Sequence, residues 1–207
     1  MKRVLWMVLL TFALPMAAFA ANVDFTNSGG TLTGGNSGLS LSGDVVTTIT
    51  GLTPGTLTGA NLGSVAFTTG AFVTGNAMNG GTFGSGGSFT ITAENIPGIA
   101  NGTTIFTGTF DCAGSNLCTW QTGNSMNPNG NHQYVLTGTI SGTWYTGATV
   151  SGMVTQLTVK TGTAYFDGMV AVSSGDTSIT TPEPGSLMLM GTGLVGLAGA
   201  LRRKLKA

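Results

Sequence analysis

The side chains that could act as acids and bases in this 207-residue sequence are few and far apart: seven Asp and Glu and one histidine. Hydrolysis of a glycosidic bond needs two carboxylates that face one substrate. A fold could bring together one of two such pairs, Glu94 with Asp111 or Asp111 with Asp167. Each of the three lies beside turn-forming residues, where a carboxylate is ordinarily solvated or caps the backbone. We therefore expect no catalytic residue, and a protein that is not an enzyme.

His132 is the only imidazole available for nucleophilic or metal chemistry, and it lies in the polar stretch NPNGNHQY. The sequence has no Gly-x-Ser-x-Gly elbow, which one large class of serine hydrolases uses. A protein zinc site uses three or four convergent ligands, and a single loop histidine does not supply them. The sequence therefore predicts neither a bound metal nor a cofactor.

The two cysteines, Cys112 and Cys118, are six residues apart in FDCAGSNLCTW. The residues between them favour a turn, and strand-forming residues flank the pair on both sides. A metal pair would need further ligands that the sequence does not offer. We expect a disulfide at the base of a short loop, provided that the chain is exported to an oxidising compartment.

A glycine pattern near the end of the chain, GTGLVG at residues 191–196, matches G-x-G-x-x-G. That pattern indicates a dinucleotide site only when a strand precedes it, and when a helix, a second strand and an acidic residue follow it. Eleven residues follow Gly196 in this sequence, too few for those elements. We therefore expect no dinucleotide cofactor here.

Charge is rare and unevenly distributed, since only 7% of the residues are charged. Between Ala21 and Thr181 the one base, Lys160, stands against six acids, a balance of 1 − 6 = −5. Such a surface does not neutralise phosphates, so nucleic-acid binding is not expected. The other six bases lie at the two ends: Lys2, Arg3, Arg202, Arg203, Lys204 and Lys206.

The first twenty residues have the organisation of a secretory signal peptide. Two bases precede an apolar run from Val4 to Leu14, and Pro15 is followed by the small-residue site Ala18-Phe19-Ala20. We expect a signal helix over residues 1–20 that is removed after Ala20. Export would place the rest of the chain where disulfides persist.

The body of the chain, residues 21–176, alternates apolar and polar residues with period two. In VLTGTISGTWY, for example, Leu136, Ile140 and Trp144 share one face with glycines, while threonines cover the other. Glycine and threonine, with 35 residues each, favour turns and strands over helices. The sequence predicts an all-β exported domain, an antiparallel β-sandwich of which the jelly roll is one form.

The tail has three parts. Residues 177–184 read as a linker that contains Pro182, Glu183 and Pro184; residues 185–201 are uncharged; and residues 202–207 are basic. Seventeen uncharged residues predict a short transmembrane helix, with Arg202, Arg203 and Lys204 as a cytoplasmic stop. Its small residues leave open whether it is a plain lipid anchor or is recognised by another helix.

This order of features resembles the PEP-CTERM sorting signal. The motif Thr181-Pro182-Glu183-Pro184, the apolar segment and the basic end carry the resemblance, which covers residues 181–207. It implies processing by an exosortase, a membrane-embedded enzyme of Gram-negative bacteria that often produce exopolysaccharide. It also implies tethering to the membrane through the C-terminal helix, followed by release to the cell surface or beyond. The two prolines would keep the junction extended and accessible to such an enzyme.

Two classes of function remain for the body. The first is a non-catalytic structural or adhesive protein of the surface or the extracellular matrix, with exopolysaccharide as a candidate partner. The second is a carbohydrate-binding or glycan-hydrolysing sandwich. Trp120 and Tyr134, which flank the polar loop, are the candidate glycan contacts, whereas Trp144 alternates with Ile140 and is expected in the core.

Overall fold

The computed structural model describes residues 21–113, 118–122, 132–160 and 165–181. The chain divides into two compact units, of which Asn22–Thr181 holds the described residues apart from Ala21. The expected signal helix, Pro-Glu-Pro motif, transmembrane helix and basic tail lie outside these ranges. Among the described residues, no helix is long and apolar enough to cross a membrane.

All the regular elements in the described ranges are strands, as the alternating pattern predicts. They are β1 (Ala21–Gly35), β2 (Gly38–Thr50), β3 (Thr56–Thr68), β4 (Phe72–Asn76), β5 (Gly80–Phe83), β6 (Gly86–Ala93), β7 (Thr104–Phe110), β8 (Thr119–Thr122), β9 (His132–Trp144), β10 (Thr149–Lys160) and β11 (Met169–Thr181). The all-β prediction is therefore confirmed.

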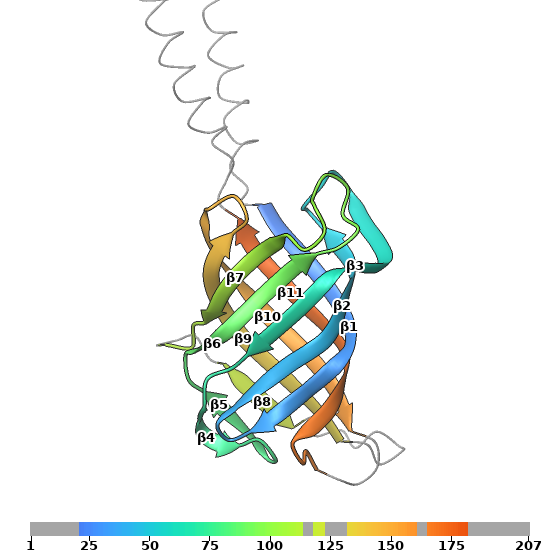
Figure 1. Cartoon of the computed structure of the whole chain (residues 1–207). Coiled ribbons are helices and arrows are strands. Elements are labelled where there is room, and N and C mark those ends of the chain that lie inside the picture. Colours follow the sequence, from blue (N-terminus) through green and yellow to red (C-terminus); the bar gives the residue numbers. More distant parts are fainter. Residues whose placement is uncertain (1–20, 114–117, 123–131, 161–164, 182–207) are drawn as a thin grey trace, which may run out of the picture. The chain divides into compact units, whose positions relative to one another are not determined.

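The strands form one antiparallel sheet that closes on itself (Figure 1). Neighbours follow the order β10, β11, β1, β2, β3, β6, β7, β9, and β9 pairs in turn with β10, so that eight strands form a closed ring. Strand β9 is the branch point. Its later half pairs with β7 and its earlier half with β8, which continues through β5 to β4.

The interior of the closed sheet is filled by the apolar face of each strand. Five phenylalanines pack edge to face or stacked, with neighbouring ring centroids 5.4–6.0 Å apart. They are Phe67, Phe83, Phe89, Phe106 and Phe110. An inward glycine makes room for one of these rings, because a Cβ at Gly138 would lie 2.7 Å from Phe110 Cδ1. Small and large residues alternate along β9 for this reason.

The outer face carries threonines and serines that meet across neighbouring strands. Hydroxyl pairs join Thr68 to Ser88 at 3.0 Å and Thr74 to Thr82 at 2.7 Å. Cross-strand hydroxyl pairs of this kind contribute a few tenths of a kcal/mol, about 0.2–1, to pairing. The sheet is therefore held outside by uncharged polar contacts and inside by packed rings.

Two sequence predictions need correction. The described strands form a single closed sheet rather than the two stacked sheets of a sandwich, because β9 pairs with β10 along its whole length. Residues 177–181 are part of β11 rather than a linker, and Ile179 is fully buried in the core. Alternation tells which face of a strand is buried, and it does not tell which strands pair.

Cys112 and Cys118 form the expected disulfide, with their Cα atoms 5.3 Å apart. The bridge joins the end of β7 to the start of β8, and the backbone N–H of Cys112 donates to Ser85 Oγ at 2.8 Å. Cys118 is almost completely buried. The crosslink therefore attaches the β8–β5–β4 extension to the closed sheet.

Reduction of this disulfide should lower the free energy of unfolding by about 2 kcal/mol, because the crosslinked loop is short and its closure entropy is modest. Urea unfolding of the wild-type protein with and without reductant measures the difference. The Cys112→Ser/Cys118→Ser variant is the control, since reductant should leave its midpoint unchanged. Equal wild-type midpoints in both conditions would contradict the prediction.

Candidate functional site

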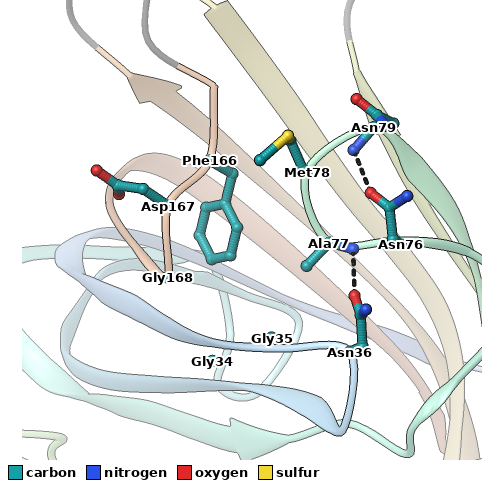
Figure 2. A pocket seen from close by; sticks show the side chains of 10 residues that line it. All are labelled: Gly34, Gly35, Asn36, Asn76, Ala77, Met78, Asn79, Phe166, Asp167 and Gly168. Carbon is teal, nitrogen blue, oxygen red and sulfur yellow. Dashed lines mark hydrogen bonds between the residues drawn. The ribbon is translucent and has the colours of Figure 1, made fainter.

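A pocket of about 480 Å³ lies at one end of the closed sheet (Figure 2). Three segments line it: 34–36, where β1 turns into β2; 76–79, between β4 and β5; and 166–168, just before β11. Strand β1 begins and β11 ends at the opposite end of the sheet, where Thr180 Oγ1 donates to Asn22 Oδ1 at 3.2 Å. The pocket therefore lies at the end remote from both chain ends of this unit.

Direct hydrogen bonds tie the three segments together. The Gly34 N–H donates to the carbonyl of Gly168 at 3.0 Å, which joins the first segment to the third. The Ala77 N–H donates to Asn36 Oδ1 at 3.0 Å, which joins the first to the second. Both bonds involve loop backbone that would otherwise depend on water. The pocket is thus built from loops with fixed relative positions.

The third connection runs through a buried tyrosine. Tyr134 Oη accepts the Phe166 N–H at 2.7 Å and donates to the Met78 carbonyl at 3.2 Å, so it joins the second segment to the third. Beside it, Trp120 Nε1 donates to the Ala77 carbonyl at 2.6 Å. The two rings stack with centroids 4.9 Å apart, and the Phe166 ring packs edge-on against both. These three side chains, Trp120, Tyr134 and Phe166, form an aromatic trio that supports the pocket from beneath.

The trio corrects the prediction that Trp120 and Tyr134 contact glycan. Both side chains are completely buried, with 0% of each exposed. Their polar tips are aimed at loop backbone, which is the usual arrangement for a buried Trp or Tyr. Neither ring can therefore contact a glycan at the surface in this structure. They position the pocket, and other residues line it.

Sequence reasoning singled out Asp167 and missed the other lining residues, most of which are small or polar. Asn36 and Asn79 are exposed, Asn76 is half-buried, and the Met78 side chain is 49% exposed. Asp167 is exposed as well, and in Figure 2 the Phe166 ring lies between Asp167 and the asparagine-bearing loop. None of the described residues that line the pocket is Lys or Arg. The available signal was the recurrence of Asn next to or near Gly at turns, which is common enough to be read as turn chemistry alone.

A second polar cluster lies inside the closed sheet, away from solvent. Asn27 and Gln156 form a reciprocal amide pair, with Asn27 Nδ2 donating to Gln156 Oε1 at 2.9 Å and Gln156 Nε2 donating to Asn27 Oδ1 at 3.3 Å. Asn27 Nδ2 also donates to Asp44 Oδ2. The pair meets over Gly175 on the intervening strand β11, where a Cβ would collide with both amides. Glycine at this position is therefore what permits the pair.

The carboxyl of Asp44 is only 1% exposed, and burial raises its pKa to about 7. The hydrogen bond from the Val45 N–H, 2.8 Å from Oδ1, and the bond from Asn27 oppose this shift and do not cancel it. Such a shifted group in a cleft would be a candidate acid or base. Asp44 is closed off from solvent, so the cluster has a structural role.

The carboxylate pairs considered for hydrolysis are not assembled. Glu94 follows the last residue of β6, and Asp111 follows Phe110, which pairs with Gly86 at the first residue of β6. The length of one strand, about 25 Å, therefore separates the two acids. Asp167 lines the pocket and Asp111 does not. Among the described residues, no three His, Cys, Asp or Glu side chains gather as a metal site, and the His132 side chain lies outside the description.

The Tyr134→Phe substitution should lower the free energy of unfolding by about 1–3 kcal/mol, because the Phe166 N–H and the Met78 carbonyl lose their buried partner. Urea unfolding measures the change. Tyr145→Phe is the matched control, because Tyr145 is 48% exposed and its change should stay within about 0.5 kcal/mol. Equal effects of the two substitutions would show that the Tyr134 hydroxyl does not hold the pocket segments.

Stability should fall as pH rises from about 4 to 7. The Asp44 pKa is about 7 in the folded chain, against about 3.9 when unfolded, so only the folded state keeps the proton in this window. Asp176 adds a slope of the same sign, since burial and then the charge of Asp24 raise its pKa. Urea unfolding of wild type and Asp44→Asn across this range measures the effect. The variant should show the shallower decline, and an unchanged slope would rule out Asp44 as its source.

Comparison with known proteins adds one result at the C-terminal end. No curated protein matches the chain, and no solved structure matches it. The family model of the PEP-CTERM protein-sorting motif matches residues 180–204. The match begins in the last two residues of β11 and includes Pro182, Glu183 and Pro184. The resemblance inferred from the sequence is confirmed, and this chain carries a PEP-CTERM protein-sorting motif at residues 180–204.

Proposed function

We propose that this chain is a non-catalytic structural or adhesive protein of the cell surface or extracellular matrix. Its C-terminal motif directs its sorting after export, and an exosortase processes it there. The observation that carries the proposal is the sorting motif at residues 180–204, which begins within the last two residues of β11 in the closed sheet. In this organisation, the C-terminal motif directs the sorting and the β domain is the part that is delivered.

The arrangement of the domain supports this proposal. Strand β1 starts at Ala21, directly after the expected signal-peptide site, and β11 ends at Thr181, directly before Pro182. These two strands are neighbours in the sheet, so the chain enters and leaves the domain at one end. The two ends of the described domain, Ala21 and Thr181, therefore lie at the same end of the sheet. The remote end, with its pocket, is left for contact with another molecule.

The distribution of polar groups supports a non-catalytic role. The outer face presents threonine and serine hydroxyls rather than charges, and the most perturbed carboxyl, Asp44, is buried in the interior. Glu94 and Asp111 lie a strand length apart, which does not suit two carboxylates that flank one glycosidic bond. Binding without hydrolysis is therefore the better-supported form of the carbohydrate alternative. Exopolysaccharide remains the candidate partner at the surface.

The double substitution Glu183→Ala/Pro184→Ala should reduce the fraction of molecules that lose the C-terminal segment at least tenfold. The reason is that it removes the charge and one proline of the motif. Intact-mass analysis of the protein, with fractionation of the producing cells, measures the fraction and its location. The wild-type chain should be processed and found at the surface or outside the cell.

The matched control is Glu94→Ala/Pro97→Ala, which removes the same two residue types from a loop after β6. This variant should be processed like the wild type. If the Glu183→Ala/Pro184→Ala chain is processed and located as the wild type is, the sorting proposal is wrong. If the mature wild type stays in the cytoplasm, the proposed surface role fails as well.

A further inference from the structure

We propose that the pocket formed by segments 34–36, 76–79 and 166–168 is a binding site for a neutral, hydroxyl-rich saccharide unit. The inference rests on the proposed surface role and adds the ligand class and the residues that would bind it. It is drawn from the chemistry of the lining, its rigidity and its place in the fold.

The hydrogen-bonding groups of the lining are side-chain amides with fixed planes. Asn36 Oδ1 accepts the Ala77 N–H at 3.0 Å, and Asn76 Oδ1 accepts the Asn79 N–H at 2.8 Å. Each bond occupies the carbonyl oxygen of its amide (Figure 2), so the NH₂ group is the donor of that side chain. Asn79 is exposed and offers both a donor and an acceptor. Alternating donors and acceptors of this kind match vicinal hydroxyl groups.

The charge of the lining selects a neutral ligand. Among the described residues that line the pocket, Asp167 is the only charged one, and none is Lys or Arg. A phosphate, sulfate or uronate would meet a carboxylate there and no basic side chain among these described residues. A hard cation needs six or more oxygens around it, yet the Phe166 ring lies between Asp167 and the loop that carries Asn76 and Asn79. A neutral molecule with hydroxyl groups is the class that these groups satisfy.

Apolar groups occupy the same pocket. Met78 is 49% exposed and Phe166 is buried beneath the surface, so a thioether side chain lies beside the asparagines on an aromatic floor. A pyranose ring has a C–H face and a hydroxyl rim, which fit such a combination of apolar and polar groups. The volume of about 480 Å³ lies within the range typical of small-molecule sites.

The pocket is also rigid, which lowers the cost of ordering it around a ligand. Each pair of its three segments is joined: through Gly34 and Gly168, through Asn36 and Ala77, and through the Tyr134 hydroxyl. Trp120 holds the middle segment from beneath. Loops fixed in this way on a packed scaffold are a common setting for binding residues.

The test uses the purified full chain and a glycan array that carries neutral glucans, galactans and N-acetylglucosamine oligomers beside uronate-containing and sulfated glycans. The dissociation constant of the best neutral glycan is then measured by calorimetry. A Cβ at Gly35 would meet no atom within 4 Å, so Gly35→Trp fills the pocket without a collision at its Cβ. We expect Gly35→Trp and Asn79→Ala each to weaken binding at least tenfold.

Two control variants make the same chemical changes elsewhere. Thr107→Trp adds the same ring on the exposed face of β7, and Asn61→Ala removes an exposed amide from β3. Both should bind like the wild type. All four variants should unfold within about 2 °C of the wild type, which separates loss of binding from loss of folding.

The proposal is overturned if the wild type binds no neutral glycan, or if the best one binds equally to Gly35→Trp. Tighter binding of the anionic glycans than of the neutral ones overturns it as well. So does a calcium site, which would be shown if calcium chloride alone shifts the melting temperature of the wild type but not that of Asp167→Asn. A chain that is sorted normally and binds no glycan refutes this inference alone. A chain that binds neutral glycan and is processed independently of Glu183 and Pro184 refutes the sorting proposal alone.

Discussion

The pairing of β9 with β10, which extends from His132 opposite Lys160 to Thr143 opposite Thr149, closes the sheet and determines the rest of the structure. An open sheet of this composition would expose long strand edges with hardly any charge to protect them, and such edges pair with other chains. Closure removes those edges within the eight-strand ring and creates an inside. The apolar faces of the strands then meet inside, where four phenylalanines of the ring strands and Phe83 of β5 pack together.

A closed interior has a fixed volume, and the sequence meets that limit with glycine. Gly138 leaves space for the Phe110 ring, and Gly175 leaves space for the amides of Asn27 and Gln156. The same interior holds Asp44 in a low-dielectric environment, so its carboxyl keeps a proton up to about neutral pH. The close packing of the interior and the protonation of Asp44 therefore both follow from the closure of the sheet. The high glycine content, which suggests flexible loops when the composition is read alone, here serves close packing as well as turns.

At the end of the ring, the loops are held by side chains that the interior provides. Trp120 and Tyr134 bury their rings and direct an indole N–H and a hydroxyl into the loop that carries Met78. Aromatic rings therefore lie beneath the pocket, and side-chain amides held by hydrogen bonds line it. It also explains how loops rich in Asn and Gly form a defined pocket in a chain with very few charges.

The all-β class, the disulfide of Cys112 with Cys118 and the sorting motif could be predicted from the sequence, because each depends on local spacing or on a contiguous run of residues. Closure of the sheet, the inclusion of residues 177–181 and the burial of Trp120 and Tyr134 could not, because they depend on which strands pair. Alternation reports which face of a strand is apolar, and it is the same for a sandwich and a closed sheet. The pocket brings together residues 34–36, 76–79 and 166–168, which are distant in sequence. Their proximity depends on strand order, and no local pattern encodes strand order.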